Sequence, residues 1–266
     1  MKPDLNTRFL IVGPCAMESE LQMKTAIQTA IEIGTPWVRA QVYKPRTNPN
    51  SFQGMEDKGI EILLKLQNQF SSMKFVCEVC SPEQMDKVSD VASMIQIGAR
   101  NMQNFELLKY VGKNFKQEFV LLKRGFANTL EEWLAAAEYL IRAGVKKEQI
   151  ILCERGSRSF TSPTGVSLDF IMALKAKSFG FRVIIDPSHG TRESQFVLPL
   201  ATAALSMNFD GVMIECHPNP ADSVSDARQA LSLNEVRDFL IGYNTGSNDS
   251  SFLHSSLRVN GSHPHH

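Results

Sequence analysis

The fold is decided by a short apolar run that ends on positive charge, Phe119-Val120-Leu121-Leu122-Lys123-Arg124-Gly125. Seven other apolar runs also end on a charged side chain or on one that can bind a metal ion, and a stretch long enough for a helix separates consecutive runs. Eight strand-helix repeats close naturally into a barrel, with functional groups just past the C-terminal ends of the strands. The other endings are Gly13-Pro14-Cys15, Tyr43-Lys44-Pro45-Arg46-Thr47, Cys77-Glu78-Val79, Gly98-Ala99-Arg100, Cys153-Glu154-Arg155-Gly156, Asp186-Pro187-Ser188-His189-Gly190 and Glu215-Cys216-His217-Pro218.

The predicted architecture is therefore a single (β/α)8 barrel, the TIM barrel fold. Short continuous apolar runs are typical of parallel strands that are buried on both faces. The spacing of Thr129 and Glu132 is that of a capping box, which predicts the start of a helix. The expected strands are Phe9–Cys15, Trp37–Tyr43, Lys74–Val79, Met94–Gly98, Phe119–Lys123, Gln149–Glu154, Arg182–Asp186 and Gly211–Glu215. The clearest helical periodicity covers Gln22–Ile33, Lys58–Phe70, Thr129–Ala143, Leu168–Lys177 and Gln195–Ser206.

Composition narrows the classes of partner. The 28 basic and 28 acidic residues balance, which argues against binding to nucleic acid or to a membrane surface through bulk charge. No run has the apolar length that spans a bilayer, and the polar segment Met1 to Asn6 does not resemble a signal peptide. The five scattered cysteines fit a reducing cytoplasm better than a disulfide scaffold. We expect a cytoplasmic enzyme that acts on small molecules.

The chain divides into one domain and a tail. Residues 1–242 hold every strand-end motif and form the expected catalytic barrel. Residues 243–266 are rich in Ser, Asn, Gly and His and have few apolar anchors. Such a composition does not offset the entropy of ordering, so we expect a flexible tail.

Four residues form a candidate metal site: Cys15, His189, Glu215 and Asp226. They follow the first, seventh and eighth predicted strands, which are neighbours in a closed barrel. One thiolate, one imidazole and two carboxylates suit Zn²⁺, Fe²⁺ or Mn²⁺, whereas Ca²⁺ prefers oxygen ligands alone. His217 lies on the same strand face as Glu215 and is a competing ligand. Each residue taken singly is equally consistent with a structural role.

Seven cations fall near the ends of the second, fourth, fifth and sixth predicted strands. Their mutual repulsion at one barrel mouth indicates that anions bind there, and arginine offers a planar fork for phosphate or carboxylate. Arg39 and Lys44 can both face inward only if Lys44 lies past its strand. Alternatively, single arginines pair with Glu18, Glu78 or Glu154 in structural networks. The cations are Arg39, Lys44, Arg46, Arg100, Lys123, Arg124 and Arg155.

In their order along the chain, these motifs resemble the type I 3-deoxy-D-arabino-heptulosonate 7-phosphate (DAHP) synthases. The β subgroup is the most similar, and the family is related to the 3-deoxy-D-manno-octulosonate 8-phosphate (KDO8P) synthases. The most specific match is Lys44-Pro45-Arg46-Thr47-Asn48-Pro49-Asn50-Ser51-Phe52-Gln53-Gly54, and the resemblance runs from about Phe9 to Leu240. The other matching segments are Ile11–Ser19, Ile97–Asn104, Cys153–Gly156, Asp186–Thr191 and Met213–Pro220.

The resemblance implies a metal-dependent, aldol-like condensation of phosphoenolpyruvate (PEP) with a phosphorylated aldose, the first step of the shikimate pathway. It implies one divalent ion (Mn, Fe, Zn or Co) and a homo-oligomer, either a tetramer or a dimer. The corresponding metal ligands are Cys15, His189, Glu215 and Asp226, and the catalytic residues are Lys44, Cys15 and His189. The positions that hold PEP are Arg39, Arg100, Lys123, Arg155 and Glu78, and those that contact the aldose phosphate are Arg46 and Thr47.

The choice of aldose rests on Pro45-Arg46-Thr47, where KDO8P synthases carry an Asn-Arg-Ser-type sequence. This favours erythrose 4-phosphate over arabinose 5-phosphate. Two segments depart from the β subgroup: Thr164-Gly165-Val166 replaces Thr-Arg-Asn, and Thr191-Arg192-Glu193 is shorter than the usual stretch. We expect a missing cation there to weaken phosphate binding or to shift aldose preference. The alternatives are another aldose phosphate, a non-catalytic barrel that binds a phosphorylated metabolite, and a Schiff-base aldolase that uses Lys123.

Overall fold

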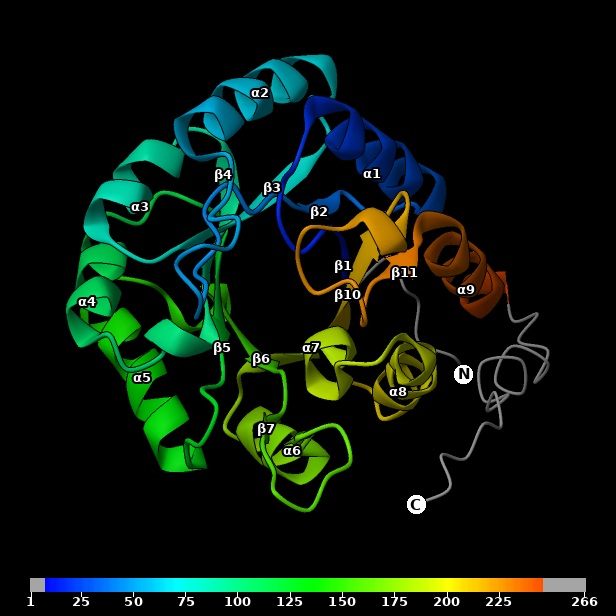
Figure 1. The fold of residues 1–266 in the computed structure, drawn as a ribbon. Helices are drawn as coiled ribbons and strands as arrows, with labels where there is room; N and C mark the ends of the chain where they lie inside the picture. The colour runs from blue at the N-terminus through cyan, green and yellow to red at the C-terminus, as the bar shows by residue number, and fades with distance from the viewer. Residues whose placement is uncertain (1–7, 246–266) are drawn as a thin grey trace.

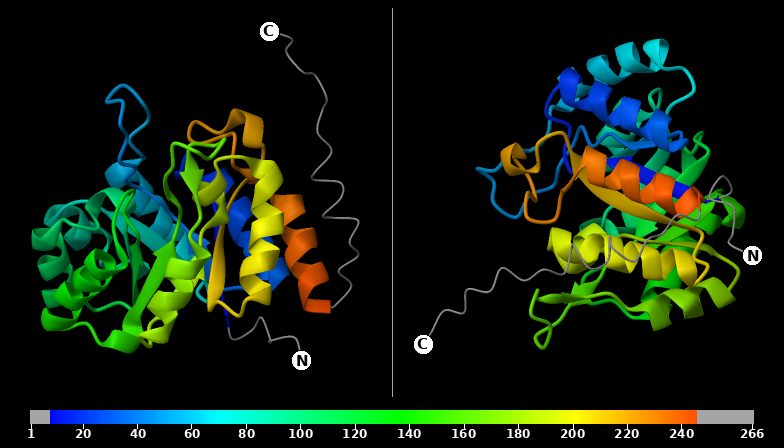
Figure 2. Two further views of the ribbon diagram at one scale, coloured as in Figure 1. Left: turned by 90° about the horizontal axis from the view of Figure 1, so that it is seen from below. Right: turned by 90° about the vertical axis from the view of Figure 1, so that its right-hand side faces the viewer.

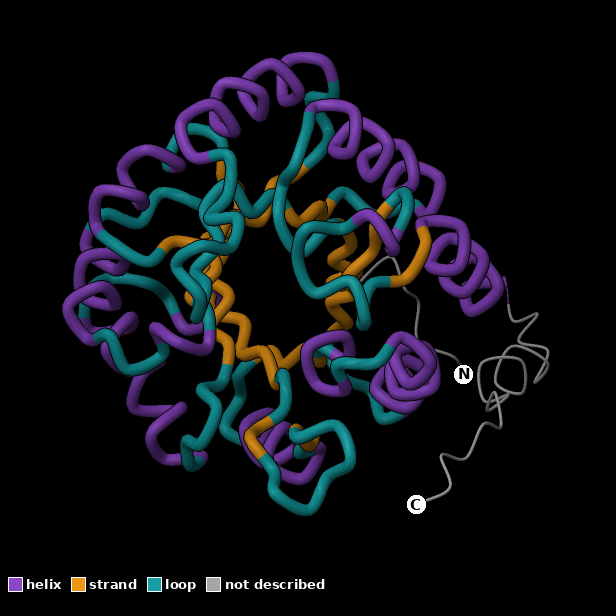
Figure 3. Tube along the Cα trace, viewed as in Figure 1, coloured by secondary structure: helices purple, strands orange, loops and turns teal. Residues whose placement is uncertain are grey.

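Eight parallel strands form a closed barrel (Figures 1 and 3). The computed structural model describes residues 8–245 of the chain. Neighbouring strands pair in chain order, and the last strand pairs with the first from Phe9 opposite Gly211 to Gly13 opposite Glu215. The predicted (β/α)8 fold is thereby confirmed. The barrel strands are β1 (Phe9–Gly13), β2 (Trp37–Arg39), β3 (Lys74–Val79), β4 (Ala92–Ile97), β5 (Phe119–Lys123), β6 (Ile150–Glu154), β9 (Arg182–Ile185) and β10 (Gly211–His217).

The helices surround the strands on the outside of the barrel (Figure 1). They are α1 (Glu20–Ile33), α2 (Glu56–Gln69), α3 (Pro82–Val88), α4 (Phe105–Lys113), α5 (Leu130–Arg142), α6 (Phe170–Ser178), α7 (Pro187–Thr191), α8 (Ser194–Ser206) and α9 (Leu233–Thr245). Two short strands, β7 (Ser157–Arg158) and β8 (Val166–Ser167), form an antiparallel hairpin after β6. The short β11 (Leu231–Ser232) pairs with the end of β10.

Local chemistry sets where the elements begin and end. The side chain of Thr129 accepts a hydrogen bond from Glu132 N, and Thr129 N in turn donates to a carboxylate oxygen of Glu132, so the predicted capping box is confirmed. Two predicted strands are too long by at least two residues, because β1 ends at Gly13 and β2 ends at Arg39. At Gly13 the backbone turns with φ of +134°, which ends the extended conformation. Lys44 accordingly lies beyond its strand, as its inward orientation requires.

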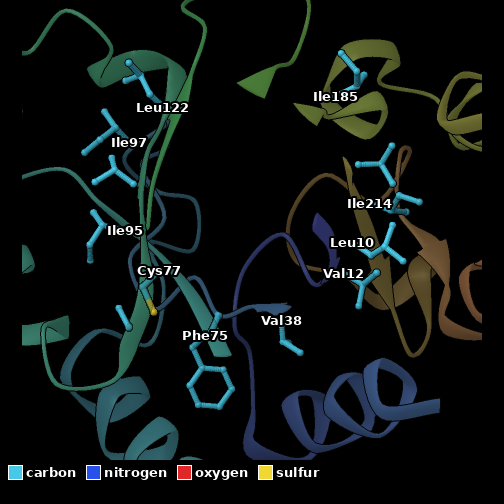
Figure 4. Packing of buried hydrophobic residues seen from close by; sticks show 14 of the residues in the cluster. Leu10, Val12, Val38, Phe75, Cys77, Ile95, Ile97, Leu122, Ile185 and Ile214 are labelled. Carbon is cyan, nitrogen blue, oxygen red and sulfur yellow. The ribbon is translucent and has the colours of Figure 1, made fainter. Parts of the chain in front are cut away.

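The residues of each strand alternate between two apolar layers. Leu10 and Val12 face outward and pack beneath the helices, whereas Ile11 between them points into the barrel. Figure 4 shows the outward set, including Val38, Phe75 and the other labelled strand residues. Because the strands are buried on both faces, their sequences lack the alternation of apolar and polar residues that marks a strand with one face in solvent.

The N-terminal end of the barrel is closed by aromatic rings. Phe9, Trp37 and Phe119 stand at the first positions of their strands, with ring centroids 5.0–5.8 Å apart. The guanidinium of Arg182 lies over Phe9 and Phe119 at 5.8 and 5.4 Å, and the ammonium of Lys74 lies over Trp37. This floor leaves the opposite end of the barrel for the polar groups.

Within residues 8–245, no helix combines the length and the apolar character needed to cross a membrane. The last helix, α9, continues to Thr245. The tail expected from the sequence lies almost wholly beyond this point, outside the described residues, and its flexibility stays a prediction.

Candidate active site

The charged strand endings gather at one end of the barrel. In the left view of Figure 2, three segments rise at this end: the blue loop between β2 and α2, the green β7–β8 hairpin and the orange segment after β10. Between them lies a cavity of about 590 Å³. The position is the one expected for the site of a (β/α)8 enzyme.

Four side chains from separate parts of the chain meet at this mouth. One ligand-type atom from each of Cys15, His189, Glu215 and Asp226 lies within 4.8 Å of the others. Cys15 Sγ is 3.9 Å from His189 Nε2 and donates to Asp226 Oδ2 at 2.8 Å, and Glu215 Oε2 is 3.6 Å from His189 Nε2. The structure thus brings together the group expected from the sequence, and this group can hold a metal ion.

The carboxylate of Glu215 shows that a cation fits this group. The side chain is 1% exposed, and its Oε1 atom has no hydrogen-bond partner among the described residues. Its Oε2 atom accepts from Gln229 at 3.0 Å and from Arg39 at 3.4 Å. Burial raises the pKa of Glu215 despite these partners. A divalent ion at this position would satisfy the unpaired oxygen and compensate the buried charge.

Each ligand is positioned by a local feature of the backbone. Gly13 lets the chain turn into Cys15, since a Cβ there would lie 3.0 Å from the backbone of Arg39. His189 lies in the short α7, which begins with Pro187 in the first turn. Asp226 adopts φ of +54°, a left-handed conformation that is uncommon for residues other than glycine.

Asp186 supports two of these side chains at once. Its Oδ2 atom lies 2.8 Å from His189 Nδ1 and 2.6 Å from Lys123 Nζ, while its Oδ1 atom accepts from His189 N. Although burial alone would raise the pKa of Asp186, its interactions with His189 and with the ammonium of Lys123 hold that pKa well below its usual value. Burial lowers the pKa of His189 to about 3, which keeps the imidazole neutral. A neutral imidazole oriented by a carboxylate is a good metal ligand.

Lys44 lies directly beside the four-residue group. Its Nζ atom donates to Cys15 Sγ at 2.6 Å and is 3.5 Å from Asp226 Oδ2. Burial, with a further contribution from Glu215, raises the pKa of Cys15 to about 12. Burial alone would lower the pKa of Lys44, but Cys15, Asp226 and Glu215 together raise it. Lys44 is therefore a protonated ammonium that can donate a proton.

A smaller inner cavity adjoins the outer one, and its wall includes the buried side chains of Arg39, Glu78 and Lys123. All five residues that the sequence assigned to PEP contribute to its wall. Glu78, which accepts from Gln96 Nε2 at 2.8 Å, is the acidic member. The five residues are Arg39, Glu78, Arg100, Lys123 and Arg155.

The outer cavity is rimmed by further cations. Arg46 and Thr47 line it, and the guanidinium of Arg100 donates to Thr47 Oγ1 at 3.2 Å. Three arginines that the sequence did not single out also line it: Arg158, Arg192 and Arg228. Arg158 follows β6, Arg192 follows β9 and Arg228 follows β10. Whether these side chains face the cavity depends on how the loops fold, which the sequence alone does not show.

Two sequence-based hypotheses are wrong. Arg124 does not join the anion-binding cations, because both ends of its buried guanidinium bind the carboxylate of Glu154, one of them at 2.8 Å. His217 does not compete for the metal position, because its Nε2 atom faces Glu18 at 3.3 Å and its Nδ1 atom lies 2.6 Å from Asn219 O.

The departure at Gly165 does not leave this part of the mouth without a cation. Arg192 Nη1 lies 3.6 Å from the position that a Cβ of Gly165 would occupy. Arg192 itself has φ of +60° at the end of α7, and it lines the outer cavity. A cation from a different loop therefore lies beside Gly165, although this segment lacks the arginine of the β subgroup.

Comparison with known proteins agrees with this arrangement. A family model described as the DAHP synthetase I family matches residues 5–248. The phospho-2-dehydro-3-deoxyheptonate aldolase of Thermotoga maritima is 40% identical over 233 residues, covering 87% of this chain and 67% of that protein. A 2-dehydro-3-deoxyphosphooctonate aldolase of Acidithiobacillus ferrooxidans is 30% identical, covering 87% of this chain and 86% of its own length.

Solved structures agree as well. The crystal structure of the Thermotoga maritima DAHP synthase superposes with a TM-score of 0.84 at 37% identity, covering 91% of this chain and 70% of that one. A truncated form of the same synthase gives 0.81 at 35% identity, covering 91% and 88%. The barrel, the ordered motifs and these matches lead to one conclusion: the chain belongs to the DAHP synthetase I family.

Proposed function

We propose that this protein condenses PEP with D-erythrose 4-phosphate and water to give DAHP and inorganic phosphate. The observation that carries the proposal is the meeting of a four-residue metal-type group with two cation-lined cavities at one barrel mouth. A phosphorylated substrate in each cavity would balance the clustered positive charge. The identity to the Thermotoga maritima enzyme supports the same reaction.

The inner cavity suits PEP. Arg39, Arg100, Lys123 and Arg155 place four cations around it, which match a small molecule that carries both a phosphate and a carboxylate. Among the described residues, Glu78 is the only acidic one in this wall, and we assign it to the orientation of these cations. Fixing PEP in this way supplies much of the rate, because the reacting carbon is then held in position.

The outer cavity suits the aldose phosphate. Arg46 and Thr47 stand at its rim, where a guanidinium fork and a hydroxyl can hold a phosphate group. The aldehyde would then point inward to Lys44 and the four-residue group. We assign these two residues to erythrose 4-phosphate because Pro45-Arg46-Thr47 differs from the corresponding KDO8P synthase segment.

Cys15, His189, Glu215 and Asp226 would hold one divalent ion, either Mn, Fe, Zn or Co. When bound, the ion supplies Lewis acidity to the aldehyde oxygen. Lys44 would donate its proton to that oxygen as C3 of PEP attacks the aldehyde carbon. Water then adds at C2, and the C2–O bond to phosphate breaks. Arg100, Lys123 and Arg155 balance the charge of the departing phosphate.

We further propose that the protein works in the cytoplasm as a homo-oligomer, either a tetramer or a dimer. All five of its cysteines are free thiols, which suits a reducing compartment. Sedimentation of the full chain measures the subunit number directly, and a monomer would contradict this assignment.

A phosphate-release assay tests the reaction. The metal-loaded protein should release phosphate when PEP and erythrose 4-phosphate are both present, and a chelator should abolish the release. Turnover with arabinose 5-phosphate instead would favour the KDO8P-type reaction. Binding of PEP without turnover of any aldose phosphate would favour the non-catalytic barrel, and a borohydride-trapped adduct at Lys123 would favour the Schiff-base aldolase.

Variants extend the same assay to the assigned roles. Lys44→Ala should lower kcat by a factor on the order of 100 or more while the metal content stays unchanged, because only a proton donor is lost. Cys15→Ala should lose metal and activity together. Normal turnover of Lys44→Ala would remove Lys44 from the mechanism.

A further inference from the structure

Three guanidinium groups surround a single phenyl ring at the mouth of the barrel. The ring is that of Phe126, which follows β5. Arg155, Arg100 and Arg158 place their Cζ atoms 4.9, 5.4 and 5.5 Å from its centroid. These arginines come from the endings of β6 and β4 and from the β7 strand, so one ring connects three loops.

The backbone of Phe126 strengthens this connection. Its carbonyl oxygen accepts a hydrogen bond from Arg158 N at 2.8 Å, which fixes the β7–β8 hairpin against the loop after β5. Phe126 therefore contacts Arg158 twice, through its ring and through its carbonyl oxygen. A substitution of the Phe126 side chain keeps the backbone hydrogen bond, so it measures the contribution of the ring alone.

The three guanidiniums have no neutralising partner in the described part of the chain. None of them lies within ion-pair distance of a carboxylate there. The contacts that they make are neutral: Arg100 donates to Thr47 Oγ1, and Arg155 donates to Gly156 O. Three like charges around one ring repel one another, whereas the ring face attracts each of them. An anion with several oxygens would complete the arrangement.

The ring stands where the two cavities meet. Phe126, Arg100 and Arg155 line both the inner and the outer cavity, and Arg158 lines the outer one. An anion bound beside the ring is therefore close to the position assigned to the phosphate of PEP. Half-burial of Phe126 leaves one part of the ring in contact with this space.

We propose that Phe126 is a positioning residue whose ring holds Arg100, Arg155 and Arg158 around the phosphate of PEP, and that Arg158 is a further ligand of that phosphate. This inference rests on the proposed function and names a part of its binding site. It assigns the effect to the π face of the ring, which an aliphatic side chain of similar volume cannot replace.

Substitutions at Phe126 separate this role from simple packing. Phe126→Leu keeps an apolar side chain and should raise KM for PEP by about 3- to 10-fold with little change in kcat. Phe126→Tyr keeps the ring and should restore KM to within about 2-fold of wild type. Phe160→Leu is the matched control, since Phe160 lies in the same hairpin segment, is fully exposed and should leave KM unchanged.

The outcomes are distinct. Equal KM values for Phe126→Leu and Phe126→Tyr would overturn the inference, while wild-type protein that neither binds nor turns over PEP would overturn the proposed function itself. Arg158→Gln, at an exposed position, is an independent second test that does not require Phe126→Leu to fold. Alone, it should raise KM for PEP about 3-fold, and an unchanged KM would exclude Arg158 as a ligand of the phosphate. Where Phe126→Leu folds, Arg158→Gln should raise KM by a smaller factor in that background, because the two residues act as one unit.

Discussion

The carboxylate of Asp186 contacts two functional side chains: the buried Lys123 and the largely buried His189. His189 and Lys123 both face its Oδ2 atom, and the same carboxylate caps α7 through His189 N. Removing one partner of a buried charged pair costs more than the pair contributes, because the remaining charge stays desolvated. Asp186 therefore links the metal-type group to the inner cavity.

The largely buried imidazole of His189 makes the stability of the metal-free protein sensitive to acid. Its pKa is about 3 in the folded state and 6.5 as its ordinary value, so between these values the unfolded chain binds a proton that the folded chain does not. Stability from this group is complete above pH 6.5 and falls as pH decreases. From pH 7 to pH 5 the free energy of unfolding should drop by about 2 kcal/mol more than in His189→Gln.

Urea unfolding of both proteins at the two pH values, with chelator present, measures this difference. Equal pH dependence in wild type and His189→Gln would show that the imidazole takes up its proton equally readily in both states. Asp226 also has a lowered pKa, since Lys44 and Cys15 outweigh the effect of burial. Because the ordinary pKa of an aspartate is 3.8, this carboxyl is ionised in both the folded and the unfolded chain between pH 7 and pH 5, and it adds little to the measured change.

Among single residues, the sequence predicted those site residues whose position is fixed by the order of the strands. It missed those whose position depends on the conformation of the loops. Cys15, His189 and Glu215 could be brought together because β1, β9 and β10 are neighbours in any closed barrel. Phe126 and Arg158 could not be found, because a ring-to-guanidinium contact depends on how two irregular loops fold over the mouth.

Among the elements, predictions succeeded where a periodic pattern was long or a cap was explicit. The strands β3 and β5 begin and end as expected, and α5 begins after the capping box. Four helices were not singled out: α3, α4, α7 and α9. The first three are short, and too few turns fit within them to produce a clear apolar stripe. The hairpin strands β7 and β8 are shorter still.

The start of α5 provides a test of local stabilisation. Thr129→Ala removes the side chain that accepts from Glu132 N, and it should lower the free energy of unfolding by about 1 kcal/mol. Thr25→Ala is the matched control in α1, where the hydroxyl only donates back to Leu21 O. Alanine favours helix interiors, so this control should be neutral or slightly stabilising. Equal losses in urea unfolding would contradict the capping argument.

For the molecule as a whole, the metal-type group lies across the seam where the barrel closes. Cys15 follows β1 and Glu215 lies in β10. These are the first and the last strands of the barrel, and their pairing closes it. An ion held there would bind only the folded chain, because its ligands are far apart in sequence. Metal occupancy and global stability are therefore linked.

Saturating metal, at about 100 times its Kd, should raise the free energy of unfolding by about 2.7 kcal/mol. Urea unfolding with added metal and with chelator measures the gain. Cys15→Ser should lose most of it, while Cys80→Ser, a cysteine outside the group, should retain it. Retention of the full gain by Cys15→Ser would place the ion elsewhere.

The aromatic floor has a consequence for the order of events during turnover. Phe9, Trp37 and Phe119 fill the N-terminal end, so we expect ligands of the inner cavity to enter from the opposite end. The inner cavity shares six lining residues with the outer one: Lys44, Pro45, Arg100, Phe126, Arg155 and His189. A molecule in the outer cavity would therefore lie close to the path to the inner cavity. We expect the ligand of the inner cavity to bind first and to be retained while the outer cavity is filled.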